Sequence, residues 1–290
     1  MSLVIGDISK TYPNGVHALQ NIQLEIPPGM FGLLGPNGAG KSSLMRTIAT
    51  LQDADTGTIS FHGLDIQKDK TGLRRQLGYL PQEFDVYPKT SAEDLLDYLA
   101  ELKGVSDRKA RKELVDHLLA VTNLTSMRKK AVATYSGGMK QRFGIAQALI
   151  GQPKLIIVDE PTAGLDPEER VRFHNLLADI KEDVTVILST HIVSDVSDLC
   201  QNFAIINHGK VLVRATPKEA IERIRGKVWE KRIERNLSNN LPADQIISMH
   251  LSMGDQVVRL FGEDLAFLGA EPVLPTLEDF YFITIKGLKV

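Results

Sequence analysis

Short apolar segments alternate with longer amphipathic segments along this chain, a pattern that predicts helices packed on the faces of a mostly parallel sheet. The predicted strands are residues 30–34, 155–158, 184–189 and 203–206. The first three of these segments are nearly all apolar, as strands buried on both faces must be. Helices are predicted at residues 41–51, 92–103, 107–121, 137–150 and 168–182.

Three further segments with strand character precede or follow the first core strand, at residues 3–5, 22–26 and 58–61. Turn residues separate them, among them Pro13-Asn14-Gly15 and Pro27-Pro28-Gly29. Antiparallel strands need only short turns between them. We therefore expect a separate antiparallel layer beside the parallel sheet.

The C-terminal region differs in charge from the rest of the chain. Residues 214–235 hold eight basic and four acidic residues, whereas residues 236–290 hold three basic and seven acidic ones. Within this region, residues 246–251 and 256–260 predict a hairpin. A last helix is expected after Thr276, which stands at capping-box spacing from Asp279. These features predict a main domain over residues 1–217 and a small α+β accessory domain over residues 218–290.

Composition narrows the class of protein. The chain has 290 residues, 24% charged and 43% hydrophobic, which is typical of a folded globular protein. Its net charge of -2 gives no global attraction to nucleic acid, so no nucleic-acid partner is expected. The single cysteine, Cys200, cannot pair within the chain, and no apolar segment is long enough to cross a bilayer. We therefore expect a cytoplasmic protein.

A phosphate-binding loop is the first motif with chemistry. The segment Gly35-Pro36-Asn37-Gly38-Ala39-Gly40-Lys41-Ser42 fits the pattern G-x-x-x-x-G-K-[ST], between a buried strand and a helix. Glycines let backbone N–H groups point at phosphates, and the helix N-terminus favours negative charge. In such a loop Lys41 reaches the terminal phosphates and Ser42 supplies a ligand to Mg²⁺.

Two carboxylates follow a buried strand, at Asp159 and Glu160. A continuing strand points successive side chains to opposite sides. Asp159 is expected to hold Mg²⁺ through its water shell, and Glu160 to polarise the attacking water. His191 follows the next core strand and is expected at the same edge of the sheet, where ligands bind in such folds. The sequence indicates no function for the other six histidines.

A second anion-binding helix terminus is predicted at Tyr135-Ser136-Gly137-Gly138-Met139, where Ser136 is a good N-cap. With this segment, the chain resembles the ATP-binding subunits of ABC transporters over about residues 1–215. Six motifs of that family occur in order: the Walker A loop at residues 35–42, a Q-loop glutamine at Gln82, the signature at residues 136–138, the Walker B strand at residues 155–160, a D-loop at residues 163–166 and the switch histidine His191. The signature departs from the usual Leu-Ser-Gly-Gly-Gln at Tyr135 and Met139.

This resemblance implies an α/β fold, a P-loop NTPase core with an antiparallel layer and a helical subdomain at about residues 93–150. It implies a site for ATP and Mg²⁺, with Tyr12 stacked on adenine and Gln82 sensing Mg²⁺ and the attacking water. Glu160, His191 and Gln82 are the implied catalytic residues, and Ser42, Gln82 and Asp159 the implied metal ligands. The implied nucleotide-binding residues are Tyr12, Gly35 to Ser43, Ser136, Gly137, Gly138, Asp159 and Asp166.

The resemblance also implies partners. Two subunits, most simply two copies of this chain, would hold two ATP molecules between the Walker A loop of one and the signature of the other. The dimer would drive a separate transmembrane permease from the cytoplasmic face of the membrane. Apolar Phe84, Val86, Tyr87 and Pro88 are candidates for a docking groove, with a satellite of the core as the alternative.

The segment Pro275-Thr276-Leu277-Glu278-Asp279-Phe280 resembles a motif near the end of exporter-type ATPases, and its alternative is a capped helix that packs the small domain. Other functions remain open. A DNA-repair or chromosome clamp normally separates its two halves by a long coiled coil, but Gln82 and Ser136 are only 54 positions apart. A translation-associated factor normally carries two ATP modules in one chain, and a small-molecule kinase lacks the signature.

Overall fold

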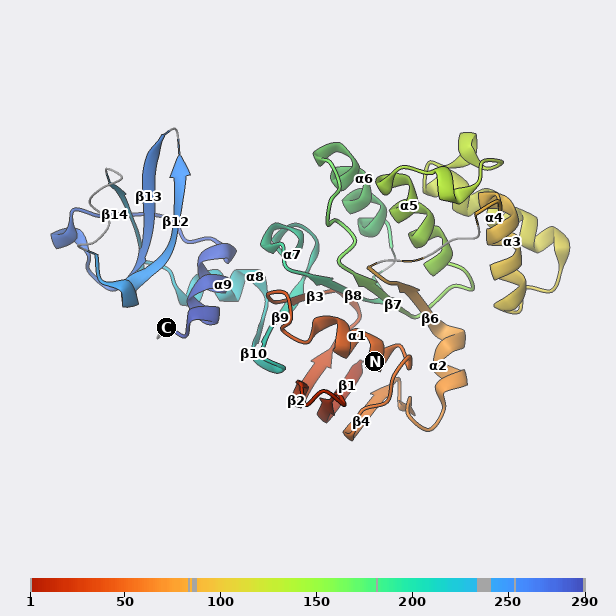
Figure 1. Cartoon of the computed structure of the whole chain (residues 1–290), viewed down its shortest axis with the longest axis horizontal. Helices are drawn as coiled ribbons and strands as arrows, with labels where there is room; N and C mark the ends of the chain where they lie inside the picture. The colour runs from red at the N-terminus through yellow and green to blue at the C-terminus, as the bar shows by residue number, and fades with distance from the viewer. Residues whose placement is uncertain are drawn as a thin grey trace.

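The computed structural model describes residues 2–82, 84, 88–180, 182–233, 241–252 and 254–288. Three sheets organise this part of the chain, with strand orders β2-β1-β4-β5, β10-β9-β3-β8-β7-β6 and β12-β13-β11-β14. The first two sheets and the helices around them lie together, and the third lies at one end of the molecule beyond helices α8 and α9 (Figure 1). The predicted α/β class is confirmed.

The six-stranded sheet is the centre of the fold. Its strands are β3 (Gly29–Leu34), β6 (Leu77–Leu80), β7 (Leu155–Asp159), β8 (Thr185–Thr190), β9 (Asn202–Asn207) and β10 (Lys210–Ala215). All neighbouring pairs are parallel except the pair of β9 and β10. Every residue of β7 and β8 is buried, as the apolar runs in the sequence predict. The carboxyl ends of β3, β7 and β8 therefore meet at one edge.

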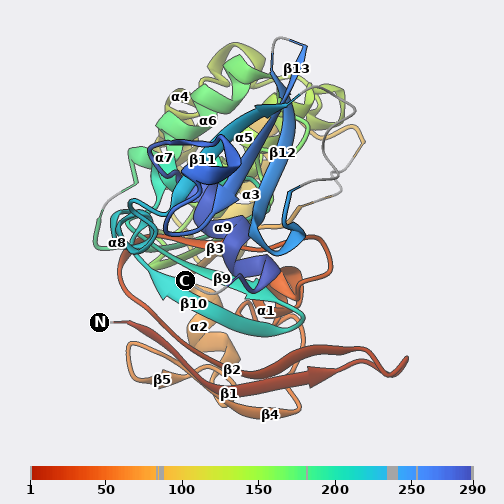
Figure 2. The same cartoon turned by 90° about the vertical axis from the view of Figure 1, so that its left-hand side faces the viewer.

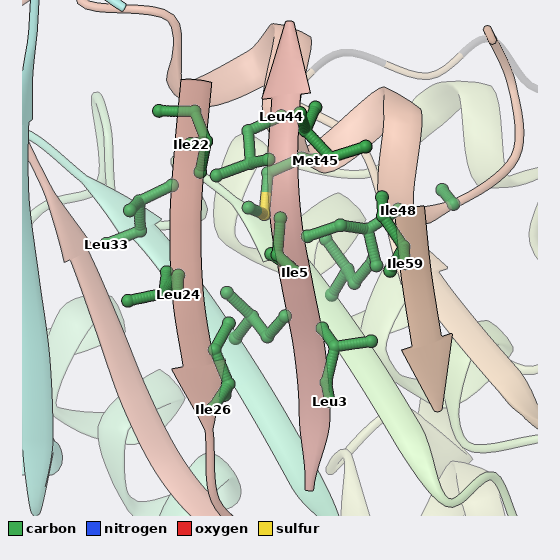
Figure 3. Packing of buried hydrophobic residues seen from close by; sticks show 14 of the residues in the cluster. Leu3, Ile5, Ile22, Leu24, Ile26, Leu33, Leu44, Met45, Ile48 and Ile59 are labelled. Atoms are coloured by element: carbon green, nitrogen blue, oxygen red, sulfur yellow. The ribbon is translucent and has the colours of Figure 1, made fainter. Parts of the chain in front are cut away.

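The predicted antiparallel layer is present as β1 (Leu3–Thr11), β2 (His17–Ile26), β4 (Thr56–Phe61) and the short β5 (Leu64–Asp65). Figure 2 shows this layer on the side of the central sheet opposite α4, α5 and α6. Helix α1 (Lys41–Ile48) lies between the two sheets. Its Leu44 and Met45 pack with Ile5 and Leu24 of the layer and Leu33 of β3 (Figure 3). This packing fixes the start of α1 against the end of β3.

The helical segment has an apolar cluster of its own. Helix α2 (Lys70–Gln76) precedes this segment in the chain. The segment itself contains α3 (Ala92–Leu102), α4 (Arg108–Val121), the short helices Thr125–Met127 and Val132–Thr134, and α5 (Gly137–Ala148). Buried residues from Ala92 to Ile150 pack on one another. Phe143 of α5 belongs to this cluster and Ile145 to the cluster of the central sheet, so α5 connects the helical segment to the sheet.

Helix ends differ from the sequence expectation by a few residues. Helix α1 ends at Ile48 rather than near residue 51, and Thr50 has left the helical conformation with φ 58°. Helix α6 (Pro167–Ala178) begins one residue earlier than expected and ends four earlier. Helix α7 (Val193–Leu199) follows β8 and was not expected from the sequence. No helix in the described part of the chain is both long enough and apolar enough to cross a membrane.

The C-terminal region contains α8 (Pro217–Arg223), β11 (Val228–Ile233), β12 (Ile246–Ser252), β13 (Asp255–Phe261), β14 (Glu271–Pro272) and α9 (Leu277–Lys286), with two short 3₁₀ turns at Ala243–Gln245 and Ala266–Leu268. Strands β12 and β13 form the predicted hairpin. Thr276 and Asp279 form the predicted capping box at the start of α9. Both expectations are confirmed.

The C-terminal region shares a core with the rest of the protein. Phe280 of α9 meets Phe203 of β9 edge to face, with ring centroids 6.4 Å apart, and each side chain is at most 2% exposed. Ile283 lies in the same cluster as Val196 of α7. The capped helix α9 therefore packs the C-terminal sheet onto the central one. This is the packing role given above as the alternative for the segment that ends at Phe280.

Candidate functional site

The phosphate-binding loop joins β3 to α1 at the carboxyl edge of the central sheet. Gly38 and Gly40 have left-handed backbones, with φ 78° and 106°. A Cβ atom on Gly40 would lie 2.5 Å from the carbonyl oxygen of Ala18, so this glycine is required by space as well as by φ. Among the residues that the structure describes, no side chain caps the N-terminus of α1. Its first N–H groups therefore remain available to an anion.

A cleft of about 570 Å³ opens over this loop. Its lining includes nine site residues predicted from the sequence, namely Tyr12, Asn37, Gly38, Gly40, Lys41, Ser42, Ser43, Gln82 and Glu160. The cleft is also lined by residues that the sequence analysis did not select, namely Val16, His17, Ala18, Gln20, His208 and Gly209. These six residues come from β2 and the position just before it, and from the turn between β9 and β10. Long-range packing alone brings that turn to the loop.

The ammonium group of Lys41 is buried and has three partners. Its Nζ atom donates to the carbonyl oxygens of Gly35 at 2.8 Å and Pro36 at 3.2 Å, and lies 3.1 Å from Oε1 of Glu160. Lys41 is 4% exposed and Glu160 7% exposed. A buried charge needs such a partner, because desolvation otherwise destabilises it. The phosphate-loop lysine and the Walker B glutamate are thus one ion pair here.

Glu160 stands just outside strand β7. The strand ends at Asp159, and Glu160 adopts a left-handed backbone with φ 47° while its N–H donates to the carbonyl oxygen of Ser189 at 2.8 Å. Regular strand conformation thus ends at Asp159, and the expectation that the two carboxylates point to opposite sides stays a prediction. Outside the strand, Oε2 of Glu160 lies 3.0 Å from Nδ1 of His191.

Asp159 is buried at the end of β7, 3% exposed. Burial raises the pKa of its carboxyl above the ordinary 3.8, whereas the hydroxyls of Ser189 and Ser42 lower that pKa. The Oδ1 atom has no hydrogen-bond partner in the described part of the chain. A buried carboxylate oxygen without a partner, near a serine hydroxyl, fits a hard cation such as Mg²⁺.

Tyr12 and Gln82 lie on the walls of the cleft. The hydroxyl of Tyr12 is 3.0 Å from Oγ of Ser43 and donates to Oε1 of Gln52 at 3.1 Å. These contacts fix the ring, half buried, against the first turn of α1. Gln82 is exposed. Of the predicted docking residues after it, Phe84 packs on the core, Pro88 is exposed, and Val86 and Tyr87 lie outside the described residues.

The signature segment starts α5 as expected. Ser136 caps the helix, accepting a hydrogen bond from the N–H of Met139 at 3.3 Å. Tyr135 is buried and its hydroxyl donates to the carbonyl oxygen of Met127 at 2.9 Å, while Met139 packs on the helical cluster. The two residues that depart from the usual signature thus face their own subdomain.

Signature and D-loop residues do not reach the cleft of their own chain. Ser136, Gly137, Gly138 and Asp166 are absent from the residues that line it. Asp166 instead caps α6, accepting from the N–H of Glu169 at 2.8 Å. Gly138 lies against Glu169, whose carboxylate would be 2.4 Å from a Cβ at that glycine. The signature helix α5 therefore packs against α6. The N-terminus of α5 does not line the cleft over the phosphate loop.

A phosphate loop on a parallel sheet, a buried lysine in that loop and a carboxylate pair at the next strand define a P-loop nucleotide-binding protein. The family model for ABC transporters matches residues 19–163. The chain belongs to this family, as an ATP-binding subunit.

Several relatives have related names. The chain is 36% identical to the linearmycin resistance ATP-binding protein LnrL of Bacillus subtilis over 68% of this chain and 63% of LnrL. It is 34% identical to the doxorubicin resistance ATP-binding protein DrrA of Mycobacterium tuberculosis over 76% of this chain and 67% of DrrA. It is 38% identical to the methionine import ATP-binding protein MetN of Chromohalobacter salexigens over 72% of this chain and 62% of MetN.

Among solved structures, the dimeric bacterial ABC transporter cassette MJ0796 matches with a TM-score of 0.68 at 24% identity. The match covers 74% of this chain and 98% of that one. This likeness shows the fold.

Proposed function

We propose that this chain binds and hydrolyses ATP with Mg²⁺, and that two copies enclose two nucleotides to drive a separate transmembrane permease. The observation that carries the proposal is the position of Glu160. Its carboxylate stands at the wall of the phosphate-loop cleft, 3.1 Å from Lys41 Nζ and 3.0 Å from His191 Nδ1. A carboxylate held between two such groups suits a general base for a water molecule that attacks a bound phosphate.

Lys41 and Glu160 are set to exchange partners when a nucleotide enters. An ammonium group has three N–H donors. Around Lys41 Nζ there are three oxygen partners, one each from Gly35, Pro36 and Glu160. A phosphate that binds Lys41 must displace one of these oxygens. Glu160 is the side-chain partner and the one that can turn away, which would free its carboxylate to accept a proton from water.

Ser42, Asp159 and Gln82 would hold Mg²⁺ at this site. Proteins usually bind this ion through one or two carboxylates together with phosphate oxygens and water. The Oδ1 atom of Asp159, which has no partner among the described residues, fits such a role. When bound, the ion supplies charge neutralisation at the phosphates.

The separation of the two phosphate-binding helix ends supports a dimer. The cleft takes nothing from Ser136, Gly137, Gly138 or Asp166 of the same chain. A head-to-tail pair would bring the signature of one chain to the phosphate loop of the other, and a homodimer is the simplest such pair. The name of the cassette MJ0796 describes a dimer of this fold.

We further propose a place at the cytoplasmic face of the membrane and a role in export. The names of LnrL and DrrA, both resistance proteins, and the segment from Thr276 to Phe280 favour export. MetN is named as an import protein, so the direction has to be measured.

A purified-protein assay tests the enzymatic part of this proposal. We expect phosphate release from ATP in the presence of Mg²⁺, loss of that release with chelator, and loss in Lys41→Ala. Lys10→Ala serves as the matched control, because Lys10 pairs with Asp55 outside the cleft. Absence of Mg²⁺-dependent phosphate release from a folded dimer would overturn the proposal. Copurification of the native complex, followed by identification of its membrane subunit, tests the permease.

A further inference from the structure

A buried carboxylate lies behind the site, in the first turn of α7. Asp195 is 0% exposed. Its Oδ2 atom accepts from the hydroxyl of Thr162 at 2.6 Å and from the hydroxyl of Thr190 at 3.0 Å. Its Oδ1 atom accepts from Arg170 Nη2 at 2.7 Å and Nε at 3.0 Å, and lies 2.9 Å from Nε2 of His174. Such a complete set of partners fixes the carboxylate in one orientation.

The two threonines lie beside the two hydrolytic groups, Thr162 in the loop after Glu160 and Thr190 at the end of β8 before His191. Thr162 is two residues after Glu160, and Thr190 immediately precedes His191. Thr162 is 4% exposed and Thr190 1% exposed, so neither hydroxyl has water as a ready alternative partner. One oxygen of Asp195 therefore joins the loop after Glu160 to the strand end before His191.

Thr190 extends this connection to the phosphate loop. Its carbonyl oxygen accepts from the N–H of Gly35 at 3.3 Å, and its hydroxyl accepts from the N–H of Ile192 at 3.0 Å. The hydroxyl thus accepts on one side and donates to Asp195 on the other. It has no freedom to turn its proton elsewhere without losing a bond.

We propose that Asp195 is a positioning residue for hydrolysis, which sets the separation of Glu160 and His191 by binding the hydroxyls of Thr162 and Thr190 while Arg170 holds it in place. This inference rests on the proposed ATPase function. Asp195 does not line the cleft, so it acts on the reaction through the Thr162 loop and the end of β8 and not by contact with nucleotide.

Replacement of Asp195 by asparagine keeps the shape of the side chain but removes one of the two oxygens that accept its hydrogen bonds. An amide offers only one oxygen, and its NH₂ group must face either Arg170 and His174 or the two threonine hydroxyls. Facing Arg170, the NH₂ group opposes the guanidinium donors. Facing the threonines, it can be bound only if their hydroxyls turn from donating to accepting. The loops should shift by a fraction of an ångström to an ångström, a displacement that can lower a reaction rate by about one-hundred-fold.

The test measures ATP affinity and hydrolysis separately in Asp195→Asn, Thr162→Val, Thr162→Ser and the control Asp198→Asn, with kcat expressed per nucleotide bound. Asp198 lies exposed on the same helix. We expect Asp195→Asn to lower kcat by about ten- to one-hundred-fold with unchanged ATP affinity. Thr162→Val, which removes one donor, should lower kcat less, and Thr162→Ser should restore it.

A purely structural role predicts a different result. It would lower the melting temperature and the fraction of protein that binds ATP, but leave kcat per bound nucleotide at the wild-type value in all variants. That result would overturn the inference. If Asp195→Asn does not fold, the comparison of Thr162→Val with Thr162→Ser decides alone, and equal kcat in the two contradicts the proposal. An inactive wild-type protein would instead refute the proposed ATPase function.

Discussion

Oε2 of Glu160 lies 3.0 Å from Nδ1 of His191, although the two residues are 31 positions apart in the chain. The contact depends on the backbone of Glu160, which leaves β7 with φ 47° and so turns its carboxylate toward the end of β8. Positive φ is uncommon for a residue other than glycine and is found often at functional sites. The local conformation of Glu160 is thus consistent with its proposed role as a base.

Replacement of Glu160 by glutamine should abolish turnover and leave ATP binding intact. The amide keeps the volume of the side chain but cannot accept the proton of an attacking water, and removal of a general base typically lowers rates by about 10² to 10⁴. Steady-state phosphate release and equilibrium ATP binding measure the two effects. Glu168→Gln, in an exposed residue of α6, should match wild type. Phosphate release near the wild-type rate in Glu160→Gln would show that another group is the base.

Asp159→Asn should raise folding stability at neutral pH while it impairs hydrolysis. Because burial raises the pKa of this carboxyl above its ordinary 3.8, the ionised form destabilises the fold. This penalty is absent below the unfolded pKa, grows as pH rises toward the folded pKa, and is full above it. The stability gain of the variant should therefore be largest at the highest pH tested and shrink toward acid.

Thermal melts of wild type and Asp159→Asn across pH check this sign, and Mg²⁺ titrations of ATPase activity check the metal role. Loss of a ligand should weaken apparent Mg²⁺ affinity by more than about tenfold. A variant that is less stable than wild type at every pH, or one with normal Mg²⁺ dependence, would contradict the assignment.

Phe280→Ala should lower the free energy of unfolding by about 3 kcal/mol without changing ATP affinity. The ring is 2% exposed and meets Phe203 edge to face, but it lies in a core far in sequence from every residue of the cleft. Chemical denaturation measures the loss. Phe267→Ala is the matched control, because that ring is 77% exposed and should contribute little. A weaker ATP affinity in a folded Phe280→Ala protein would mean that the C-terminal region acts on the nucleotide site.

Local patterns predicted much of the fold. The phosphate loop and the start of α1, the buried runs of β7 and β8, the caps of α5 and α9 and the hairpin of β12 and β13 all depend on residues near one another in sequence. Helix α2 and strand β6 were missed. Helix α2 is polar apart from Leu73 and is marked by little more than its cap Asp69, and β6 has only four residues.

The parts of the site that escaped prediction depend on contacts between distant segments. His17 and His208 line the cleft because β2 and the turn after β9 meet there, and nothing beside either residue in sequence indicates this. The bond from Thr162 to Asp195 spans 33 positions. Glu160 leaves the strand conformation while its N–H still donates to the carbonyl oxygen of Ser189 on the neighbouring strand, and strand periodicity alone does not indicate this change.

A mixing experiment tests the shared-site dimer most directly. Lys41→Ala removes the phosphate-loop cation of its own chain, and Ser136→Arg places bulk at the signature helix end of its own chain. Neither variant alone can form an intact site. In a heterodimer, the unmodified loop of the Ser136→Arg chain faces the unmodified signature of the Lys41→Ala chain, and one whole site returns.

Light scattering on each variant, their mixture and wild type measures ATP-dependent association. This measurement decides whether the site is shared between two chains. Our account predicts dimers in wild type and in the mixture, and monomers in either variant alone, with hydrolysis in the mixture low if two working sites are needed. Monomers in a mixture of two folded variants, under conditions where wild type dimerises, would contradict it.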